Sequence, residues 1–283
     1  MAEISAKLVK ELRDKTGAGM SDCKKALEQS GGDIEKAIEY LRKQGAAAAA
    51  KRADREAQEG VVVVASTPDY KAAVMVEVNC ETDFVARNEA FLKFAHAVVH
   101  AALHARASTV ETLLQVPLGS EFDNLPVSQA VEVMTGKLGE KIAIRRISLM
   151  ESTDGIVVSY VHPGARLASL VHLTGIDGNI GTIGKDIAMQ VAAAAPIALT
   201  RADVPKEQID KEVEILRTQA QNEGKPAHVI DRIVSGRLEK FYQEVVLLDQ
   251  PFIKDGGKSV AELLKEAGSV EVKAFARFQL GEK

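Results

Sequence analysis

Hydrophobic residues in the first part of the chain recur with the spacing of short helices. Leu8 and Leu12 are four residues apart, and the segment 17–19, with two glycines, interrupts this stripe. A second stripe ends at the two glycines 31–32, and Asp33 is placed to cap a third helix. A bundle of three such helices encloses too little volume for a substrate pocket, so we expect a docking module here.

An alanine-rich segment follows the third stripe. Gly45 precedes five consecutive alanines, and mostly charged residues occupy 51–56. This composition is typical of a helical or partly flexible linker. We therefore predict that residues 1–55 form a three-helix module with its linker and that the core begins at residue 56.

The middle of the chain contains an internal repeat at an offset of 95 residues. Six identities connect residues 60–78 with residues 155–173, where chance would supply about one. The identical pairs are Gly60 with Gly155, Val62 with Val157, Val63 with Val158, Pro68 with Pro163, Ala73 with Ala168 and Val76 with Val171. We infer a duplicated unit, which divides the core into subdomains at 56–150 and 151–283.

Each copy of this unit predicts a β-hairpin that turns at its proline, then a helix, then a closing strand. These elements are expected at 72–78, 89–105 and 142–147 in the first copy and at 167–173, 185–195 and 272–278 in the second. Alternation in the last strand predicts one shared face for four residues: Val272, Ala274, Ala276 and Phe278. The predicted fold class is α+β, with antiparallel sheets covered by helices.

A long helical segment is inserted into the second copy. One apolar stripe runs from Ile209 to Ala220, a turn follows at 224–226, and a second stripe runs from Ile230 onward. We predict an antiparallel helical hairpin over residues 205–247. Because a two-helix arm has no interior for a cofactor, its expected role is contact with another subunit.

Composition and charge disfavour several classes of function. The chain has 283 residues, of which 46% are hydrophobic and 27% charged, as in ordinary globular proteins. A net charge of -4 and the lack of tryptophan argue against nucleic acid as the main partner. Two cysteines are too few for a disulfide framework or a four-cysteine zinc site. The sequence has no leader-like start and no run of about twenty apolar residues, so we expect a cytoplasmic protein without a membrane partner.

A glycine-rich segment superficially resembles a phosphate-binding loop. Gly178, Gly181 and Gly184 precede Lys185, but Asp186 stands where such a loop needs serine or threonine. Its negative charge would repel a phosphate. We predict a turn and a helix cap instead.

A histidine stripe and a cysteine are also better explained as structure. His96, His100 and His104 have a spacing that can bind zinc on one helix. The predicted buried face of that helix consists of Phe91, Ala95, Val98 and Ala102. The histidines then lie on its solvent side, and we expect no metal site. Cys80 lacks a readable orienting group, so a buried structural cysteine is favoured over a nucleophile.

The most informative segment is the loop after the first hairpin. Phe84 and Val85 are large apolar residues between Asp83 and Arg87 in the loop 77–88, whereas the second copy has ordinary turn residues at 176–179. An exposed aromatic residue in a loop is a candidate hot spot for a partner's pocket. The alternative is that Phe84 folds back as a hydrophobic staple onto the helix that begins near Asn88. The residues alone leave both readings open.

Several segments match the signatures of one known family. Residues 12–27 resemble its amino-terminal signature, and residues 77–87 resemble its second signature, with the tetrad Thr82-Asp83-Phe84-Val85 intact. Shorter matches lie at 137–140, 162–166, 188–193 and 250–252. On these motifs the chain resembles the elongation factor Ts family over essentially its whole length.

The resemblance implies a guanine-nucleotide exchange factor for elongation factor Tu that is not itself an enzyme. Members weaken the partner's hold on GDP and magnesium and stabilise the nucleotide-free partner until GTP binds. Such a protein needs no cofactor or metal of its own. The implied contacts reach the partner's G domain and a further domain, and a homodimer and a dimer of heterodimers are both compatible with the sequence.

The resemblance also implies partner-binding residues. Phe84 would enter a pocket between two helices of the partner's G domain, with Asp83 making polar contacts beside it. Lys24 matches a family residue that contacts the G domain. Further contacts map to the rest of the tetrad and to two other loops: Thr82, Val85, Leu138, Gly139 and His162.

Two other classes of function remain as alternatives. The three-helix module, with Gly19-Met20 in its first loop, resembles ubiquitin-associated domains and would suit a polypeptide-binding adaptor. That likeness covers only about the first 45 residues. A hydrolase using Cys80 or the histidine stripe is a third, weaker reading. Acceleration of GDP release from elongation factor Tu would distinguish the exchange factor from both.

Overall fold

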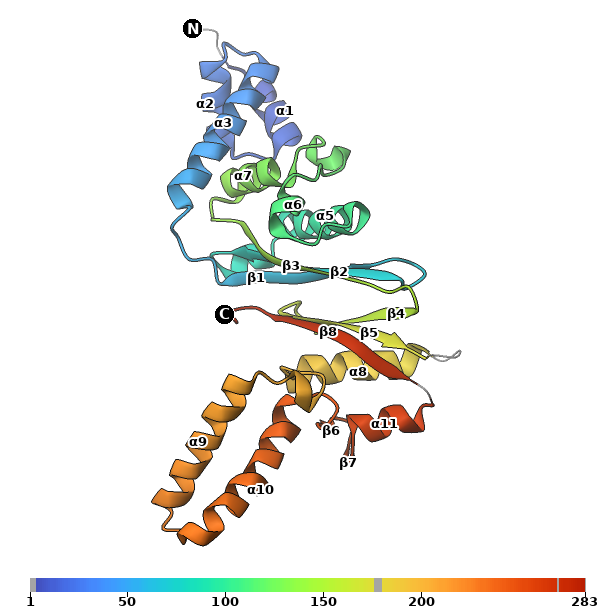
Figure 1. Cartoon of the computed structure of the whole chain (residues 1–283). Coiled ribbons are helices and arrows are strands. Elements are labelled where there is room, and N and C mark those ends of the chain that lie inside the picture. The colour runs from blue at the N-terminus through green and yellow to red at the C-terminus, as the bar shows by residue number, and fades with distance from the viewer. Residues whose placement is uncertain (1–3, 176–179, 269, 283) are drawn as a thin grey trace.

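The computed structural model describes residues 4–175, 180–268 and 270–282, which form a mixed α/β fold with antiparallel sheets. Two three-stranded sheets lie face to face in the middle of the molecule (Figure 1). In spatial order, the first contains β1 (Glu59–Ser66), β2 (Ala72–Cys80) and β3 (Ala143–Glu151). The second contains β4 (Gly155–Val161), β5 (Leu167–Thr174) and β8 (Glu271–Gln279).

Helices cover the outer faces of both sheets, so the core has four layers (Figure 1). α5 (Glu89–Ala105) packs on β1 and β2, and α8 (Ile180–Ala194) packs on β4 and β5. α6 (Val110–Leu114) and α7 (Val127–Leu138) contribute to the same core as α5. A separate cluster of apolar side chains fills the space between the two sheets, which therefore bury both of their faces.

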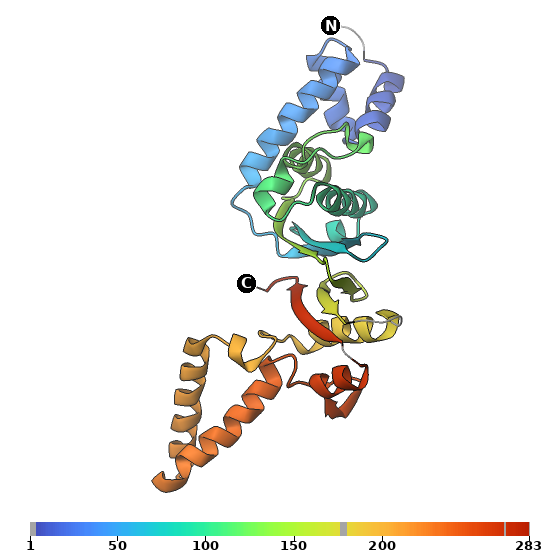
Figure 2. The same ribbon diagram turned by 45° about the vertical axis from the view of Figure 1, so that its right-hand side comes forward.

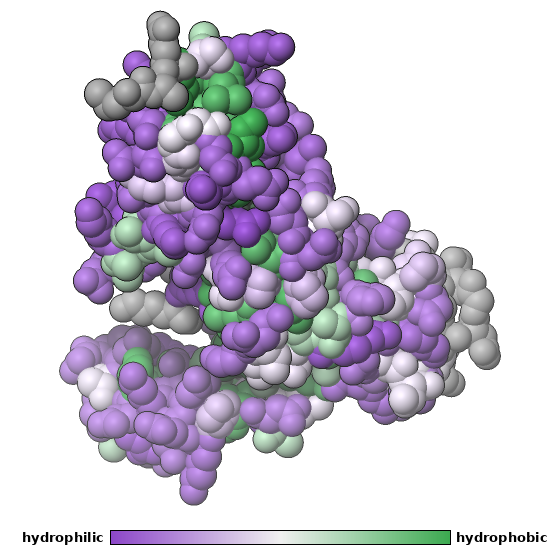
Figure 3. All heavy atoms as spheres, turned by 90° about the horizontal axis from the view of Figure 1, so that it is seen from above, coloured by the Kyte–Doolittle hydropathy of each residue, from purple (hydrophilic) through white to green (hydrophobic). Residues whose placement is uncertain are grey.

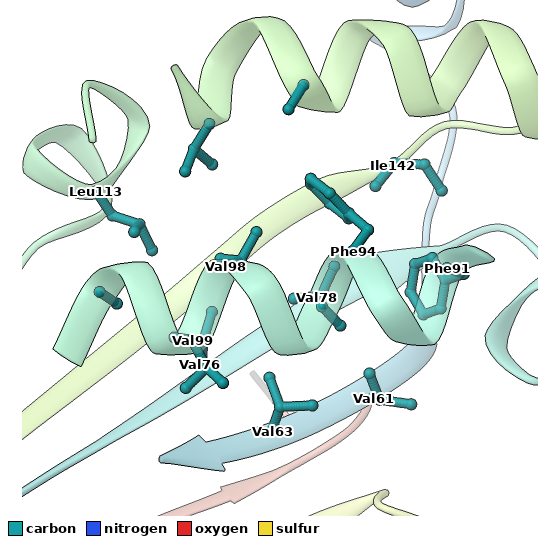
Figure 4. Close-up of a cluster of buried hydrophobic side chains, with 14 of the residues drawn as sticks. Val61, Val63, Val76, Val78, Phe91, Phe94, Val98, Val99, Leu113 and Ile142 are labelled. Atoms are coloured by element: carbon teal, nitrogen blue, oxygen red, sulfur yellow. The ribbon is translucent and has the colours of Figure 1, made fainter. Parts of the chain in front are cut away.

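α5 illustrates how the sequence builds this core. Asn88 caps its first turn by accepting a hydrogen bond from the Ala90 backbone N–H at 2.9 Å. Its buried side includes Phe91 and Phe94, which belong to the same apolar cluster as the valines of β1 and β2. Phe94 projects from α5 on the side toward Ile142 (Figure 4). The predicted bounds and buried face of this helix are confirmed.

The two sheets repeat one plan of hairpin, helix and closing strand, as the internal repeat predicts. Even an irregularity is duplicated. The ladder between β2 and β3 shifts register between Glu77 and Val78, and the ladder between β5 and β8 shifts between His172 and Leu173. These two sites are separated by the same offset as the sequence repeat. The closing strands β3 and β8 therefore each have a β-bulge at the equivalent position of the ladder.

The bulge in β8 corrects the predicted face of that strand. Leu173 pairs with Val272 and His172 pairs with Ala274, so Lys273 is an extra residue. Val272 consequently packs with the cluster beneath α8, whereas Phe278 packs between the sheets. The prediction that four alternating residues share one face is therefore wrong, because a bulge reverses the alternation.

The amino-terminal helices are α1 (Ala6–Thr16), α2 (Met20–Gln29) and α3 (Ile34–Arg52). Asp33 accepts a hydrogen bond from the Lys36 backbone N–H at 3.1 Å, which confirms the predicted cap. The three helices enclose a small apolar cluster of their own.

The alanine-rich segment is an ordered part of α3 and packs on α7. The two helices approach closely at two glycines: a Cβ added to Gly136 would lie 2.9 Å from the Gly45 Cα. Small side chains permit this close crossing. The alanine-rich segment is therefore helical, as one of the two predicted forms of the linker has it, and the partly flexible form is wrong.

α9 (Lys206–Asn222) and α10 (Ala227–Val245) pack on each other and project away from both sheets (Figure 1, Figure 2). Their shared cluster includes Ala220 and Ile230. Gly224 adopts a left-handed conformation at the turn, with φ of 72°. The helices are also linked at the surface by Arg217–Asp231 and Arg237–Glu223 ion pairs, each 2.7 Å long.

Short elements complete the described chain. They are η1 (Ser120–Phe122), η2 (Arg201–Asp203), β6 (Pro251–Phe252), β7 (Asp255–Ser259) and α11 (Val260–Glu266). Within the ranges that the structure describes, every helix is too short or too polar to cross a bilayer.

Candidate functional site

The turn after β2 directs one aromatic side chain into solvent. α4 (Asp83–Ala86) is capped by Thr82, whose hydroxyl accepts a hydrogen bond from the Val85 backbone N–H at 3.4 Å. Ala86 is buried and Val85 packs against the core, so this short helix is anchored on one side. Phe84 lies on the other side and is 83% exposed.

Phe84 is unusual for this surface. Where Figure 3 views the molecule from above, the surface is mainly hydrophilic. Among the described residues, the next most exposed large hydrophobic side chain is Tyr70, at 54%. The staple interpretation of Phe84 is therefore wrong: Phe91 and Phe94 already fill the core at the start of α5 (Figure 4). An aromatic side chain that an anchored turn holds in solvent is a candidate docking feature.

Asp83 adds a charge beside this aromatic side chain. Its carboxylate pairs with Arg87 across one helical turn, with 2.9 Å between Asp83 Oδ2 and Arg87 Nη2. Both side chains are substantially exposed, so solvent screens the pair and its contribution to stability is small. The carboxylate can therefore exchange Arg87 for a donor on another protein at little cost.

The loop after α7 lies directly against the α4 turn. Gly139 ends α7 in a left-handed conformation with φ of 75°, and Leu138 packs against the core. The next residue, Glu140, accepts hydrogen bonds from the backbone N–H groups of Glu81 and Thr82. Sequence reasoning singled out Leu138 and Gly139 but missed Glu140, whose only signal was its place in the motif at 137–140.

His162 lies in the turn between β4 and β5, at the same end of the core. Its Nδ1 is 3.0 Å from the Tyr160 hydroxyl oxygen. Arg166 of the same turn forms an ion pair with Glu59, and Glu59 is opposite Cys80 in the β1–β2 register. The turn that contains His162 is thus joined to the strand ends from which α4 emerges.

Lys24 is the predicted site residue that stands apart from this group. It is exposed on α2, and its Nζ is 3.9 Å from a Glu28 carboxylate oxygen. The amino-terminal helices contact α7, where a Cβ added to Gly17 would lie 2.4 Å from Lys137 Nζ. The end of α3 also contacts the loop after α7, where Lys141 donates a hydrogen bond to the Ala53 carbonyl. The tetrad, the 138–139 loop and the His162 turn are therefore brought together, whereas Lys24 lies on a neighbouring unit.

The motifs that resembled ligand sites provide no such arrangement. His96, His100 and His104 are exposed on α5, and within the described residues no three potential metal-binding side chains gather. The predicted turn at 176–179 lies outside the described residues. α8 begins at Ile180, before the predicted start at residue 185, so Gly184 lies inside the helix. There it packs on Val158. The predicted turn and helix cap is therefore wrong for residues 180–185.

We expect the Cys80 thiol to resist alkylation until the protein unfolds. Cys80 is buried, its Sγ donates a hydrogen bond to the Thr82 carbonyl at 3.2 Å, and burial raises its pKa to about 12. A thiolate, the reactive form, is therefore scarce between about pH 7 and pH 9. Mass spectrometry after maleimide treatment, with and without denaturant, measures this. Rapid labelling of Cys80 in the native protein would contradict it.

Comparisons with known proteins all point to one family, and the similarity to relatives covers the whole chain. A family model described as Elongation factor TS matches residues 81–282. Elongation factor Ts of Chloroherpeton thalassium is 53% identical over 289 residues, and that of Chlorobium limicola is 54% identical over 288 residues. In both comparisons the similarity covers all of this chain and all of the relative. The chain therefore belongs to the elongation factor Ts family.

Proposed function

We propose that this protein is the guanine-nucleotide exchange factor of elongation factor Tu. It binds the GDP form of its partner, promotes release of GDP and magnesium, and stabilises the nucleotide-free partner until GTP binds. The observation that carries the proposal is Phe84, which an anchored turn holds 83% exposed. Family membership supports the same activity.

In the proposed mechanism the Asp83–Phe84 turn acts as a wedge in the partner's G domain. Phe84 fills a pocket between two helices, and Asp83 exchanges its surface contact with Arg87 for a polar group of the partner. A shift of those helices would withdraw groups that compensate the charge of the bound phosphates and magnesium. Reciprocity then requires that GDP weaken binding of this protein by the same factor.

The remaining contacts follow from where the other site residues lie. Thr82 and Val85 hold the wedge in place. Leu138 ends α7, and Gly139 and His162 lie in turns at the same end of the core. We propose that these loops extend the interface on the G domain and that Lys24, on the amino-terminal helices, forms a further contact. The helical arm at 205–247 remains available for a second domain of the partner or for another copy of this chain.

The proposal includes a division into three units. Residues 1–55 form a module similar to ubiquitin-associated domains, and residues 56–150 and 151–283 form the two halves of the core. The protein works without a cofactor and is not an enzyme, and we place its activity in the cytoplasm, with translation. A polypeptide-binding adaptor built on the amino-terminal module is the alternative.

Release of a fluorescent GDP analogue from elongation factor Tu tests the proposal. With excess unlabelled GDP, trace amounts of this protein should accelerate loss of fluorescence from a large molar excess of loaded partner, because an exchange factor turns over. An adaptor would bind without changing the rate. If release is not accelerated, or if acceleration needs stoichiometric amounts throughout, the proposed function is wrong.

A further inference from the structure

Two loops that are distant in the sequence are tied together beneath the exposed aromatic residue. Glu140 Oε2 accepts hydrogen bonds from the Glu81 backbone N–H at 3.1 Å and the Thr82 backbone N–H at 2.9 Å. Glu140 Oε1 accepts a third from the Thr82 hydroxyl at 2.6 Å. One half-buried carboxylate therefore satisfies both backbone donors that precede α4 and also orients its capping hydroxyl.

The link is reciprocal. Glu81 Oε1 accepts a hydrogen bond from the Lys141 backbone N–H at 2.7 Å, and this bond is the main reason that the pKa of Glu81 lies below its usual value. Glu81 also pairs with Arg55 at 3.2 Å. Lys141 in turn donates from Nζ to the Ala53 carbonyl at 2.6 Å. Each loop thus supplies a carboxylate that caps the backbone of the other loop.

This arrangement matters because Phe84 has little support of its own. Its side chain is in solvent, and α4 is a single turn too short to hold its own shape without packing. Val85 and Ala86 hold the end of the turn on the core, so the direction of Phe84 also depends on the backbone of 81–82, from which the turn starts. A mobile turn would lose conformational freedom on binding and weaken the complex, whereas a fixed turn avoids that cost.

We infer that Glu140 is a positioning residue for nucleotide exchange: its carboxylate holds the backbone of Glu81 and Thr82 so that Phe84 already points outward before the partner arrives. The inference rests on the proposed function and deepens it, since it assigns to the loop after α7 a role within this chain. Glu140 acts through Phe84 and is not required to touch the partner.

Three substitutions separate geometry from charge. Glu140→Ala removes all three acceptor contacts and should slow catalysed GDP release by about tenfold, the expected cost of freeing one interfacial element. Glu140→Gln should retain most of the activity, because its amide oxygen can accept both backbone N–H groups while its N–H donates to the Thr82 hydroxyl. Glu140→Asp keeps the charge but is one methylene too short and should resemble alanine. Glu121→Ala, which removes an exposed carboxylate paired only at the surface with Lys93, is the matched control.

A double-mutant cycle tests the route of the effect. In a Phe84→Ala background, Glu140→Ala should cause no further loss, because a residue that acts only by positioning Phe84 has nothing left to position. Hydrogen exchange provides a readout that is independent of activity. The amides of Glu81 and Thr82 should exchange at least about tenfold faster in Glu140→Ala and Glu140→Asp than in the wild type or Glu140→Gln.

Each outcome decides the inference. Wild-type activity in Glu140→Ala, or an additional loss in the Phe84→Ala background, would overturn it. If Glu140→Ala does not fold, the contrast between Glu140→Gln and Glu140→Asp decides, and equal activity of these two variants would overturn it. A wild-type protein that does not accelerate GDP release would instead reject the proposed function, and the inference with it.

Discussion

Replacing Phe84 with alanine is expected to slow catalysed GDP release from elongation factor Tu by about thirtyfold or more. A loop aromatic residue that fills a partner's pocket typically contributes about 2 kcal/mol or more to binding, and each 1.4 kcal/mol corresponds to about a factor of ten. Since the side chain is 83% exposed, its removal leaves no cavity. The melting temperature should therefore change by less than about 2 °C.

The control for this prediction is another exposed aromatic residue. Tyr70 is 54% exposed in the turn between β1 and β2, at the far end of the hairpin from α4. The Tyr70→Ala variant should accelerate GDP release from elongation factor Tu as much as the wild-type protein does. Stopped-flow fluorescence measures the rates, and thermal unfolding monitors the fold. If Phe84→Ala retains normal exchange, or if both variants lose activity equally, the wedge mechanism is incorrect.

The parts of the fold that could be predicted are those with a local cause. The bounds of α5 follow from a cap at Asn88 and an uninterrupted apolar stripe, and both are encoded within a few residues of each other. The duplicated plan could be predicted because the two copies still share identities such as Gly60 with Gly155. Asp33 caps α3 for the same local reason.

The predictions that were wrong concern features of the fold that depend on contacts with a segment far away in the sequence. The face reversal in β8 depends on a bulge at Lys273, which is defined only by pairing with β5. The alanines of α3 have the composition of a linker, and their order comes from packing on α7, a helix about ninety residues further along the chain. Neither feature has a local sequence signal, because both are consequences of tertiary contacts.

The candidate site also combines one feature with a local sequence signal and others that depend on tertiary contacts. Phe84 was recognisable as a large apolar residue in a polar loop, but whether it faced the core or solvent depended on whether Phe91 and Phe94 already filled the space. Glu140 lies 58 residues from Thr82 in the sequence, so their hydrogen bond could not be predicted from the residues. Tertiary structure was needed to convert a motif into a supported wedge.

The largest expected effect on stability comes from one of the duplicated glycines. Gly60 lies opposite Asn79 in the β1–β2 ladder with φ of 142°, a conformation that residues with a side chain rarely adopt. A Cβ at this position would lie 2.1 Å from the Val78 carbonyl oxygen and 2.8 Å from the Asn79 Cα. A Cβ added at Gly155 would likewise lie 1.9 Å from the Leu173 carbonyl oxygen, so the repeat preserves a site of close backbone approach.

Gly60→Ala should therefore destabilise the protein by about 3 kcal/mol or more, because both backbone strain and a clash with a paired strand must be relieved. The melting temperature is expected to fall by roughly 6 °C or more. Gly119→Ala is the matched control, since its φ is -62° and an added Cβ would meet no described atom within 4 Å. Differential scanning calorimetry compares the two variants with the wild type. Equal melting temperatures would mean that β1 can move away from β2 at no cost, and the shared glycines would then need another explanation.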